Sequence, residues 1–415
     1  MAEKPYQWAD GAVLEDHSRR KHKILREYFF NYLTVRCQIA QMERFRLAVV
    51  DGFAGGGKYD CGTSGSPLIF VEELKHAVEA VNARRAAEGL GPVEIECLFI
   101  PNDFSRDAIE TLKSNLAPLQ AEITANMPRL HLRVEYLNLA FEEAYPQIKQ
   151  LLEQGRYRNV LFNLDQCGHS KVQRATLVDI MRSYQSVEIF YTFAIQTLLT
   201  YLQTNDPVRL ANQLQPFDIS VNDLQSQTVG MNKQHWLGAA ERLVFDSFNG
   251  CATYVSPFSI NNPDGWRYWL IHFANSYRAR QVYNNLLHAN SSEQAHYGRA
   301  GLHMLSYDPR HEDGSLYLFD PSGRESARDR LLLDIPRLIS ESGNVIGVGE
   351  FYEGIYNATP AHSEDIHQAI IDNPDLEVVT PAGGERRSAR AIALGDVVKL
   401  KRQTSFFPMF FDPAK

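Results

Sequence analysis

The sequence predicts an α/β protein in which a parallel sheet, covered by helices on both faces, is followed by a smaller α+β module. Short apolar segments alternate with amphipathic helical segments over the first half of the 415-residue chain, which is the pattern of a parallel sheet. Two strand-like segments joined by a turn then interrupt this alternation, and a short helix with two strands lies near the end of the chain.

The first predicted helix covers about 17–36, because apolar side chains recur at helical spacing from Ile24 to Leu33. The first half of this helix is strongly basic and carries Arg19, Arg20, Lys21, Lys23 and Arg26. Such a charge run is either a solvated helix face or a surface that faces phosphate groups. Under the second interpretation, Arg19 and Lys23 are candidate nucleic-acid contacts.

A repeated strand–helix pattern follows. The segment from Phe45 to Asp51 is short, apolar and bounded by glycine, which predicts a buried strand. A glycine-rich loop leads from it to a helix that Ser66 can cap and whose first turn holds Pro67. The pattern continues with strands predicted at 93–100, 130–136, 159–164 and 187–193. Helices are predicted after them at 105–116, 140–153, 172–184 and 194–203.

The alternation then ends. A helix is predicted at 234–248, and the strand-like segments 252–260 and 267–274 are joined by a Pro-Asp-Gly turn at 263–265. A parallel sheet closed by an antiparallel hairpin is the layout of the Rossmann-like class I methyltransferases, which depend on S-adenosylmethionine. A plain dinucleotide-binding domain is expected to end with a parallel strand instead.

The remainder of the chain opens with a helix predicted at 276–290. Short strands near Leu302 and Leu316 and a helix at 324–340 follow. Its last elements are a helix at 364–371 and strands at 376–380 and 396–401. We therefore expect three parts, namely an N-terminal helical extension over 1–40, a methyltransferase-like domain over 41–300 and the module over 301–415.

The two last strands flank a basic segment. Six basic and three acidic residues lie between 376 and 403, and Arg386, Arg387 and Arg390 fall between the strands. A helix followed by a basic β-wing fits a winged-helix-like module, in which these three arginines are candidate nucleic-acid contacts. The alternative is an edge hairpin that its charges protect from aggregation.

The composition narrows the class of protein. Hydrophobic residues make up 44% and charged residues 22% of the chain, which excludes wholesale disorder. The net charge of -8 argues against a histone-like protein that binds nucleic acid through its overall positive charge. The five cysteines are irregularly spaced, which argues against a disulfide framework and against a CxxC metal site. The acidic residues are not clustered in the way that a nuclease with two metal ions requires. Without a long apolar run or a signal peptide, we expect a cytoplasmic protein.

The strongest chemical signal is the loop after the first strand, Asp51-Gly52-Phe53-Ala54-Gly55-Gly56-Gly57. Glycines after a buried strand let backbone N–H groups approach a ligand. A dinucleotide fingerprint fits poorly, because the extra loop from Lys58 to Gly65 delays the helix. The first motif of class I methyltransferases fits better, which makes S-adenosylmethionine the expected cofactor. Its binding residues would be Asp51, beside the amino acid end, with Gly52, Phe53, Gly55 and Gly57.

Two further positions follow from the topology, because open parallel sheets bind ligands beyond the carboxyl ends of their strands. Asp103 follows the second strand and either accepts hydrogen bonds from the ribose hydroxyls or caps the next helix. Asn138 follows the third strand and either holds the adenine amino group or is an ordinary turn residue.

The loop after the fourth strand holds the candidate catalytic residues. Asp165 is a candidate general base or acceptor-orienting group, and His169 is a second candidate base. Cys167 is either a small buried residue or a nucleophile toward a pyrimidine ring. Amine-methylating enzymes carry Asp/Asn-Pro-Pro-aromatic here, whereas this chain has Asp-Gln-Cys-Gly, which leaves a catalytically silent fold open.

Four sequence blocks together resemble the three-Cys-motif partner proteins of bacteria. The blocks are Lys21–Arg26, Asp51–Gly55, Gly65–Leu68 and Leu164-Asp165-x-x-Gly168, and the resemblance covers about residues 8 to 300. It implies a methyltransferase-like fold and a nucleic-acid or phage-defence context. Because such proteins are often encoded beside a phage-type Cys-motif protein, the neighbouring gene product and nucleic acid are the expected partners.

These observations lead to two hypotheses. In the first, the chain is an enzyme that transfers a methyl group from S-adenosylmethionine to nucleic acid. In the second, it is a non-catalytic partner that keeps the fold to bind a nucleotide-like ligand, nucleic acid or another protein.

Overall fold

The computed structural model describes residues 8, 12–166, 168–202, 205–228, 233–261, 267–290, 294–297, 316–318 and 321–401. The chain divides into two compact units, Met1–Val282 and Tyr283–Lys415. Cys167, the turn predicted at 263–265, the strand predicted near Leu302 and the basic residue Arg402 lie outside the described residues.

The first unit is built on a mixed, mostly parallel sheet. Its strands are β1 (Arg44–Asp51), β2 (Glu94–Pro101), β3 (Leu130–Val134), β4 (Asn159–Leu164), β5 (Ser186–Phe193), β6 (Tyr254–Asn261) and β7 (Arg267–Ala274). They lie side by side in the order β3-β2-β1-β4-β5-β7-β6. Only β7 runs against its neighbours in this unit's described strands, because it pairs antiparallel with both β5 and β6. The predicted parallel sheet ending in an antiparallel hairpin is thereby confirmed.

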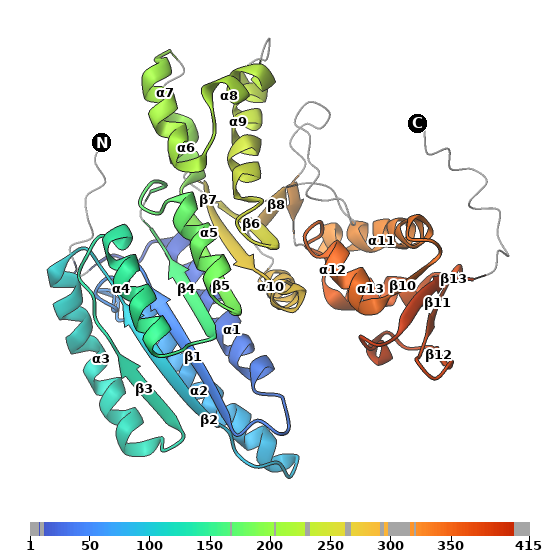
Figure 1. The fold of residues 1–415 in the computed structure, drawn as a ribbon, viewed down its shortest axis with the longest axis horizontal. Coiled ribbons are helices and arrows are strands. Elements are labelled where there is room, and N and C mark those ends of the chain that lie inside the picture. Colours follow the sequence, from blue (N-terminus) through green and yellow to red (C-terminus); the bar gives the residue numbers. More distant parts are fainter. Residues whose placement is uncertain are drawn as a thin grey trace. The chain divides into compact units, whose positions relative to one another are not determined.

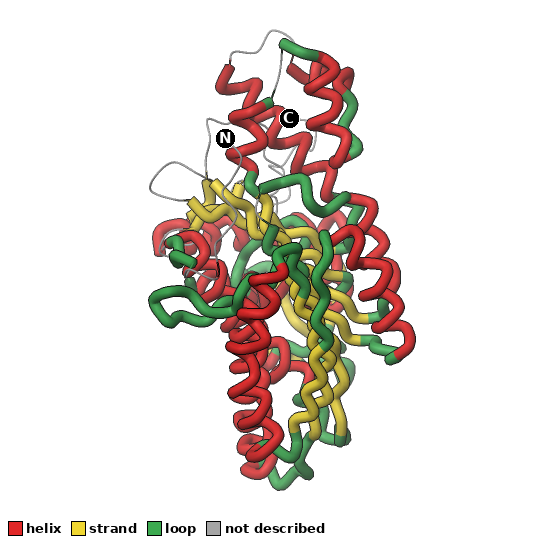
Figure 2. The backbone as a smooth tube through the Cα atoms, turned by 90° about the vertical axis from the view of Figure 1, so that its left-hand side faces the viewer, coloured by secondary structure: helices red, strands yellow, loops and turns green. Residues whose placement is uncertain are grey.

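Helices cover both faces of this sheet, as the edge-on view in Figure 2 shows. The helices that follow the strands are α2 (Ser66–Ala87), α3 (Arg106–Asn126), α4 (Phe141–Gln154), α5 (Arg174–Ser183) and α6 (Ile195–Tyr201). Helix α1 (Asp16–Arg36) packs against α2, which also contacts α3. Beyond α6 come α7 (Pro207–Leu214), α8 (Val221–Thr228), α9 (Lys233–Phe248) and α10 (Tyr277–Ala289).

Two local predictions need correction. The helix predicted to end at Leu116 continues through Pro118 to Asn126, because Leu112, Leu116 and Ile123 form one buried stripe whose packing outweighs the lost hydrogen bond. Ser66 does not cap α2 but is its first residue, after Gly65. The Ser105 cap is confirmed, since its side chain accepts from the Ala108 N–H group at 3.3 Å.

The second unit contains a three-helix, β-winged module at its carboxyl end. Its helices are α11 (Pro321–Glu341), α12 (Val348–Ile355) and α13 (Ser363–Asp372). Its strands are β10 (Val345–Gly347), β11 (Leu376–Val379), β12 (Glu385–Arg386) and β13 (Val397–Leu400), in the order β10-β13-β11-β12. Figure 1 shows α11, α12 and α13 beside this small sheet. A further hairpin joins β8 (Gln294–Tyr297) to β9 (Leu316–Leu318).

Candidate functional site

A cavity of about 800 Å³ lies at the carboxyl edge of the first unit's sheet. Its walls are the loops that follow β1, β2, β3 and β4, together with side chains of β5 and β7 and the first turns of α1. We call it the edge chamber. Open α/β sheets bind ligands at this edge, because their strands all deliver their following loops to it.

The glycine-rich loop forms the floor of the edge chamber. Gly52, Phe53 and Gly55 line it, and Gly55 has a φ of +61°, a conformation that favours glycine. The Gly55 N–H group donates to the Asp103 carboxylate at 2.9 Å. A Cβ atom at Gly55 would lie 2.2 Å from the Trp8 ring, so the indole packs directly on this loop.

Two of the predicted cofactor residues lie behind this loop and do not line the chamber. Asp51 is fully buried, accepts a hydrogen bond from Asn163 at 3.0 Å, and has its pKa raised to about 7 by burial. Gly57 has a φ of +80°, and a Cβ atom there would lie 2.5 Å from Leu68. Both residues therefore shape the loop from the side of the protein core.

Asp103 and the neighbouring Phe104 form the wall after β2. The Asp103 carboxylate accepts from the N–H groups of Gly55 and Ser105, and burial raises its pKa. Phe104 lines the chamber although 80% of its surface is exposed. Asn138 does not line the chamber, because its amide donates to the carbonyl groups of Asp103 and Phe104 and so holds their loop.

An ion pair between α1 and the loop after β4 forms the opposite wall. The Lys21 ammonium lies 2.5 Å from the Asp165 carboxylate, and the Lys21 side chain is only 8% exposed. Burial alone would raise the pKa of Asp165, but the charge and hydrogen bond of Lys21 outweigh it, and the pKa is lowered. Thr192 of β5 also hydrogen-bonds this carboxylate. Asp165 is therefore a charged group and a weak base.

Two imidazoles of α1 complete this wall. His17 stacks on Tyr268 of β7 at 4.3 Å, and burial lowers its pKa to about 4. His22 is buried, and burial lowers its pKa to about 4 as well, so it is neutral at pH 7. Its Nδ1 atom has no hydrogen-bond partner among the described residues. Sequence reasoning missed both histidines, because they belong to a helix whose basic residues predict an exposed face.

The remaining catalytic candidate, His169, does not line the chamber. Its ring instead meets the ring of Phe193 edge-on, and burial lowers its pKa. Of the candidate catalytic residues that the structure describes, Asp165 alone lines the chamber.

The basic residues of α1 have divided roles. Lys21 points into the chamber, whereas Arg26 pairs with Glu72 at 2.6 Å and Glu73 at 2.5 Å on α2. Arg19 and Lys23 are exposed. Lys21 and Arg26 are thus paired with acids of other elements, and Arg20 pairs with Asp16 of its own helix, so a phosphate-facing surface on α1 would rest on Arg19 and Lys23.

The predicted arginines of the basic wing also differ from one another. Arg386 pairs with the buried Asp396 at 2.9 Å and so braces the loop. Arg387 and Arg390 are exposed.

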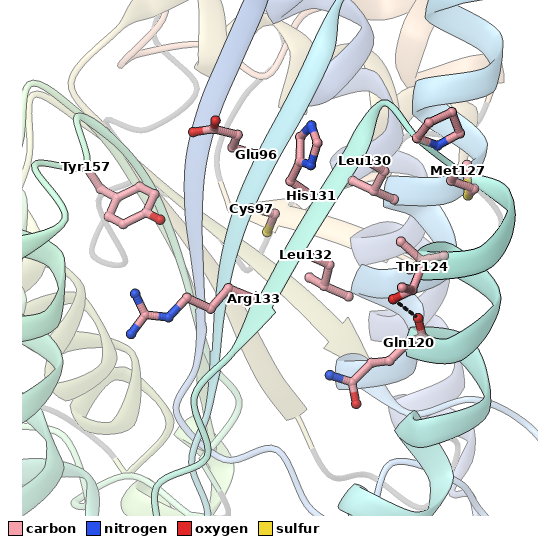
Figure 3. A pocket seen from close by; sticks show the side chains of 12 residues that line it. Glu96, Cys97, Gln120, Thr124, Met127, Leu130, His131, Leu132, Arg133 and Tyr157 are labelled. Carbon is pink, nitrogen blue, oxygen red and sulfur yellow. Dashed lines mark hydrogen bonds between the residues drawn. The ribbon is translucent and has the colours of Figure 1, made fainter.

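A second cavity, of about 520 Å³, lies along the edge strand β3. It combines side chains from the two faces of the sheet edge, with Arg133 and Tyr157 on one side of the strands and Leu132, Thr124 and Gln120 on the other (Figure 3). It shares no residue with the edge chamber, and none of the residues predicted from the sequence lines it. The edge chamber is therefore the candidate site.

Part of the chain is similar to a known protein family. A family model described as a GMT-like wHTH domain, that is, a winged helix-turn-helix domain, matches residues 306–383. No curated protein matches the chain. The match covers α11, α12, α13 and β11, and the strands β12 and β13 that follow it both pair with β11 and form the wing. The prediction of a winged-helix-like module is confirmed.

Among the residues that the structure describes, no cluster of three or more His, Cys, Asp or Glu side chains suited to a metal ion occurs. No helix there has the length and apolar character needed to cross a membrane.

The Lys21–Asp165 pair generates a stability prediction. Lys21→Met leaves the Asp165 carboxylate without its cation, so we expect the free energy of unfolding at pH 7 to fall by about 3 kcal/mol. The double variant K21M/D165N should lose less than the sum of the single variants. Because the folded-state pKa of Asp165 is lowered, the stabilisation exists above the ordinary aspartate pKa and disappears as the pH falls through the folded-state value. Urea unfolding across this pH range measures it, and additive losses would contradict the coupling.

Proposed function

We propose that the first unit binds S-adenosylmethionine in the edge chamber and transfers its methyl group to nucleic acid. The observation that carries this proposal is the convergence of the glycine loop and Asp103 at the carboxyl edge of a sheet ordered β3-β2-β1-β4-β5-β7-β6 with β7 reversed. This is the strand arrangement expected of a class I methyltransferase, and residues of the predicted cofactor loop line the edge chamber, whose volume is about 800 Å³.

The charges of the chamber support a cationic ligand. Four carboxyl groups and two lysines line it, namely those of Glu15, Asp103, Glu142, Asp165, Lys21 and Lys171. Since the two imidazoles are neutral at pH 7, the net charge of the lining is negative. S-Adenosylmethionine carries a sulfonium and an ammonium group, which such a lining attracts, whereas a dinucleotide would bring a repelled pyrophosphate.

The loop after β2 offers groups that can bind the adenosine part of the ligand. Each carboxylate oxygen of Asp103 accepts one backbone hydrogen bond, from Gly55 or from Ser105. Each oxygen therefore keeps a further lone pair that can accept a hydrogen bond from a ribose hydroxyl. The adjacent Phe104 ring is exposed at the chamber, where it can stack on a purine. The residues present therefore fit the ligand.

The side chains of α1 that line the chamber suit the end of the ligand that carries the methyl group. The bound ligand supplies an electrophilic methyl group, and the protein holds the acceptor in line with it. An amine or hydroxyl acceptor becomes acidic as the methyl group is transferred, so a weak base can take up its proton. His22 lines the chamber with a pKa of about 4 and an Nδ1 atom that has no hydrogen-bond partner among the described residues, and it is the proposed proton acceptor. Asp165 acts through charge, since its pairing with Lys21 keeps it ionised and weakly basic.

The winged helix-turn-helix match supports nucleic acid as the acceptor class, because such domains commonly deliver an attached domain to a duplex. The resemblance of the sequence to the three-Cys-motif partner proteins supports, as part of this proposal, a role in bacterial phage defence together with the product of a neighbouring gene.

A second function is favoured by one observation. The Trp8 indole packs on the Gly55 loop, where the amino acid end of the ligand would lie. A non-catalytic partner protein that keeps the chamber filled by its own N-terminal residue would show this packing.

Ligand binding separates these two functions. Isothermal titration calorimetry with S-adenosylmethionine should show binding to the wild type and an affinity on the order of 10-fold lower for Phe104→Ala, because one base–aromatic stack is lost. Folding should be unaffected, since the ring is exposed. Val208→Ala removes a similarly exposed apolar side chain of α7 away from the chamber and serves as the control. Equal affinities of wild type and F104A would remove Phe104 from the site.

Methyl transfer tests the role of His22. His22→Gln keeps hydrogen-bonding atoms but cannot take up a proton, so transfer of labelled methyl groups to DNA or RNA should fall by roughly 10²–10⁴-fold while ligand binding persists. His169→Gln, outside the chamber, is the matched control and should keep its activity. The wild-type rate should decline as the pH falls toward the His22 pKa of about 4. A pH profile shared by wild type and H22Q would exclude His22 as the base.

A further inference from the structure

The helix-turn-helix of the second unit is acidic. From α12 through α13, residues 348–372 contain no lysine or arginine, and they contain Glu350, Glu353, Glu364, Asp365 and Asp372. A helix-turn-helix that reads a duplex places its second helix in the major groove, between two rows of phosphates. Carboxylates in that position are repelled by the phosphates.

The exposed face of α13 shows this charge directly. Glu364, Gln368 and Asp372 are exposed and lie four residues apart, so they occupy one face of the helix. The inner face is held by Asp365, which is buried and paired with Arg324 at 2.6 Å and Arg328 at 2.8 Å on α11. These two arginines of α11 are therefore engaged with α13 and do not offset the acidity of its outer face.

The wing has the opposite charge. Residues 381–401 contain five basic and two acidic residues. Arg386 holds the buried Asp396 through two contacts, at 2.9 and 3.2 Å, and Asp396 also accepts from the Ala393 N–H group, so the loop is braced from within. Arg387, Arg390 and Lys401 are exposed on this braced loop and the end of its last strand.

We propose that the second unit binds the phosphate backbone of a nucleic-acid duplex through the wing residues Arg387, Arg390 and Lys401, with α13 turned away from the grooves. The inference rests on the proposed nucleic-acid function and specifies its surface. Because phosphate contacts carry no sequence information, this unit binds duplexes without sequence preference. Any sequence selectivity in methylation then comes from the edge chamber.

Fluorescence anisotropy of the full chain at low salt, with two labelled duplexes of unrelated sequence, tests this surface. We expect equal affinity for both duplexes and a loss on the order of 10-fold in R387E/R390E. The slope of log affinity against log salt should become shallower by about 2, since each lost phosphate contact removes roughly 0.9. The matched pair E364Q/D372Q on α13 should change the affinity less than threefold for both duplexes. The four substituted side chains are exposed, so the circular dichroism spectra of both double variants should match that of the wild type.

The possible results distinguish a wrong contact surface on the second unit from a wrong nucleic-acid function. Binding retained by R387E/R390E would overturn the wing as the contact surface. A sequence preference altered by E364Q/D372Q would overturn it as well and would assign the contact to α13. Absence of wild-type binding to any duplex or to RNA would overturn the nucleic-acid function itself.

Discussion

The part-buried ion pair between Lys21 and Asp165 is the constraint on which the candidate site depends. It joins residues 144 positions apart and ties the first turns of α1 to the loop after β4. Two further contacts extend the same attachment, from Arg26 to the acids of α2 and from Tyr28 to Glu188 of β5. Helix α1 is therefore an integral wall of the edge chamber.

The same ion pair decides the chemistry available there. It keeps Asp165 ionised and lowers its pKa, so the carboxylate contributes charge and position. It also brings His22 into the chamber beside Lys21, where burial keeps the imidazole neutral. For the proposed methyl transfer, the proton acceptor is therefore His22 of α1, whereas the sequence predicts it in the loop after β4.

Much of the fold can be predicted from the sequence, because buried parallel strands are continuous apolar segments. Strand β4 begins and ends at the predicted residues, Asn159 and Leu164, and β1 differs by one residue. Elements with weak patterns are missed. Helix α12 has the sequence VGEFYEGI, whose two glycines and short length resemble a loop, and only its packing in the winged-helix unit makes it helical.

The candidate site is less predictable than the fold. Gly55, Asp103 and Asp165 are found because topology brings strand ends together. Lys21 and His22 are not found, because charged residues on a helix predict exposure and the partner that buries them is remote in sequence. Asp51 and Gly57 are predicted to contact the cofactor but lie on the core side of the loop, for a related reason. A motif gives the order of residues but not which of them face the cavity and which face the core.

The central claim, that the edge chamber holds an adenosyl ligand between the glycine loop and α1, is tested most directly by a crystal structure of the full chain with S-adenosylhomocysteine. We expect the ribose hydroxyls on the Asp103 carboxylate, the adenine against Phe104 and the sulfur directed toward the wall of His22 and Asp165. Ligand density elsewhere, or an edge chamber that stays occupied by Trp8 at saturating ligand, would contradict it.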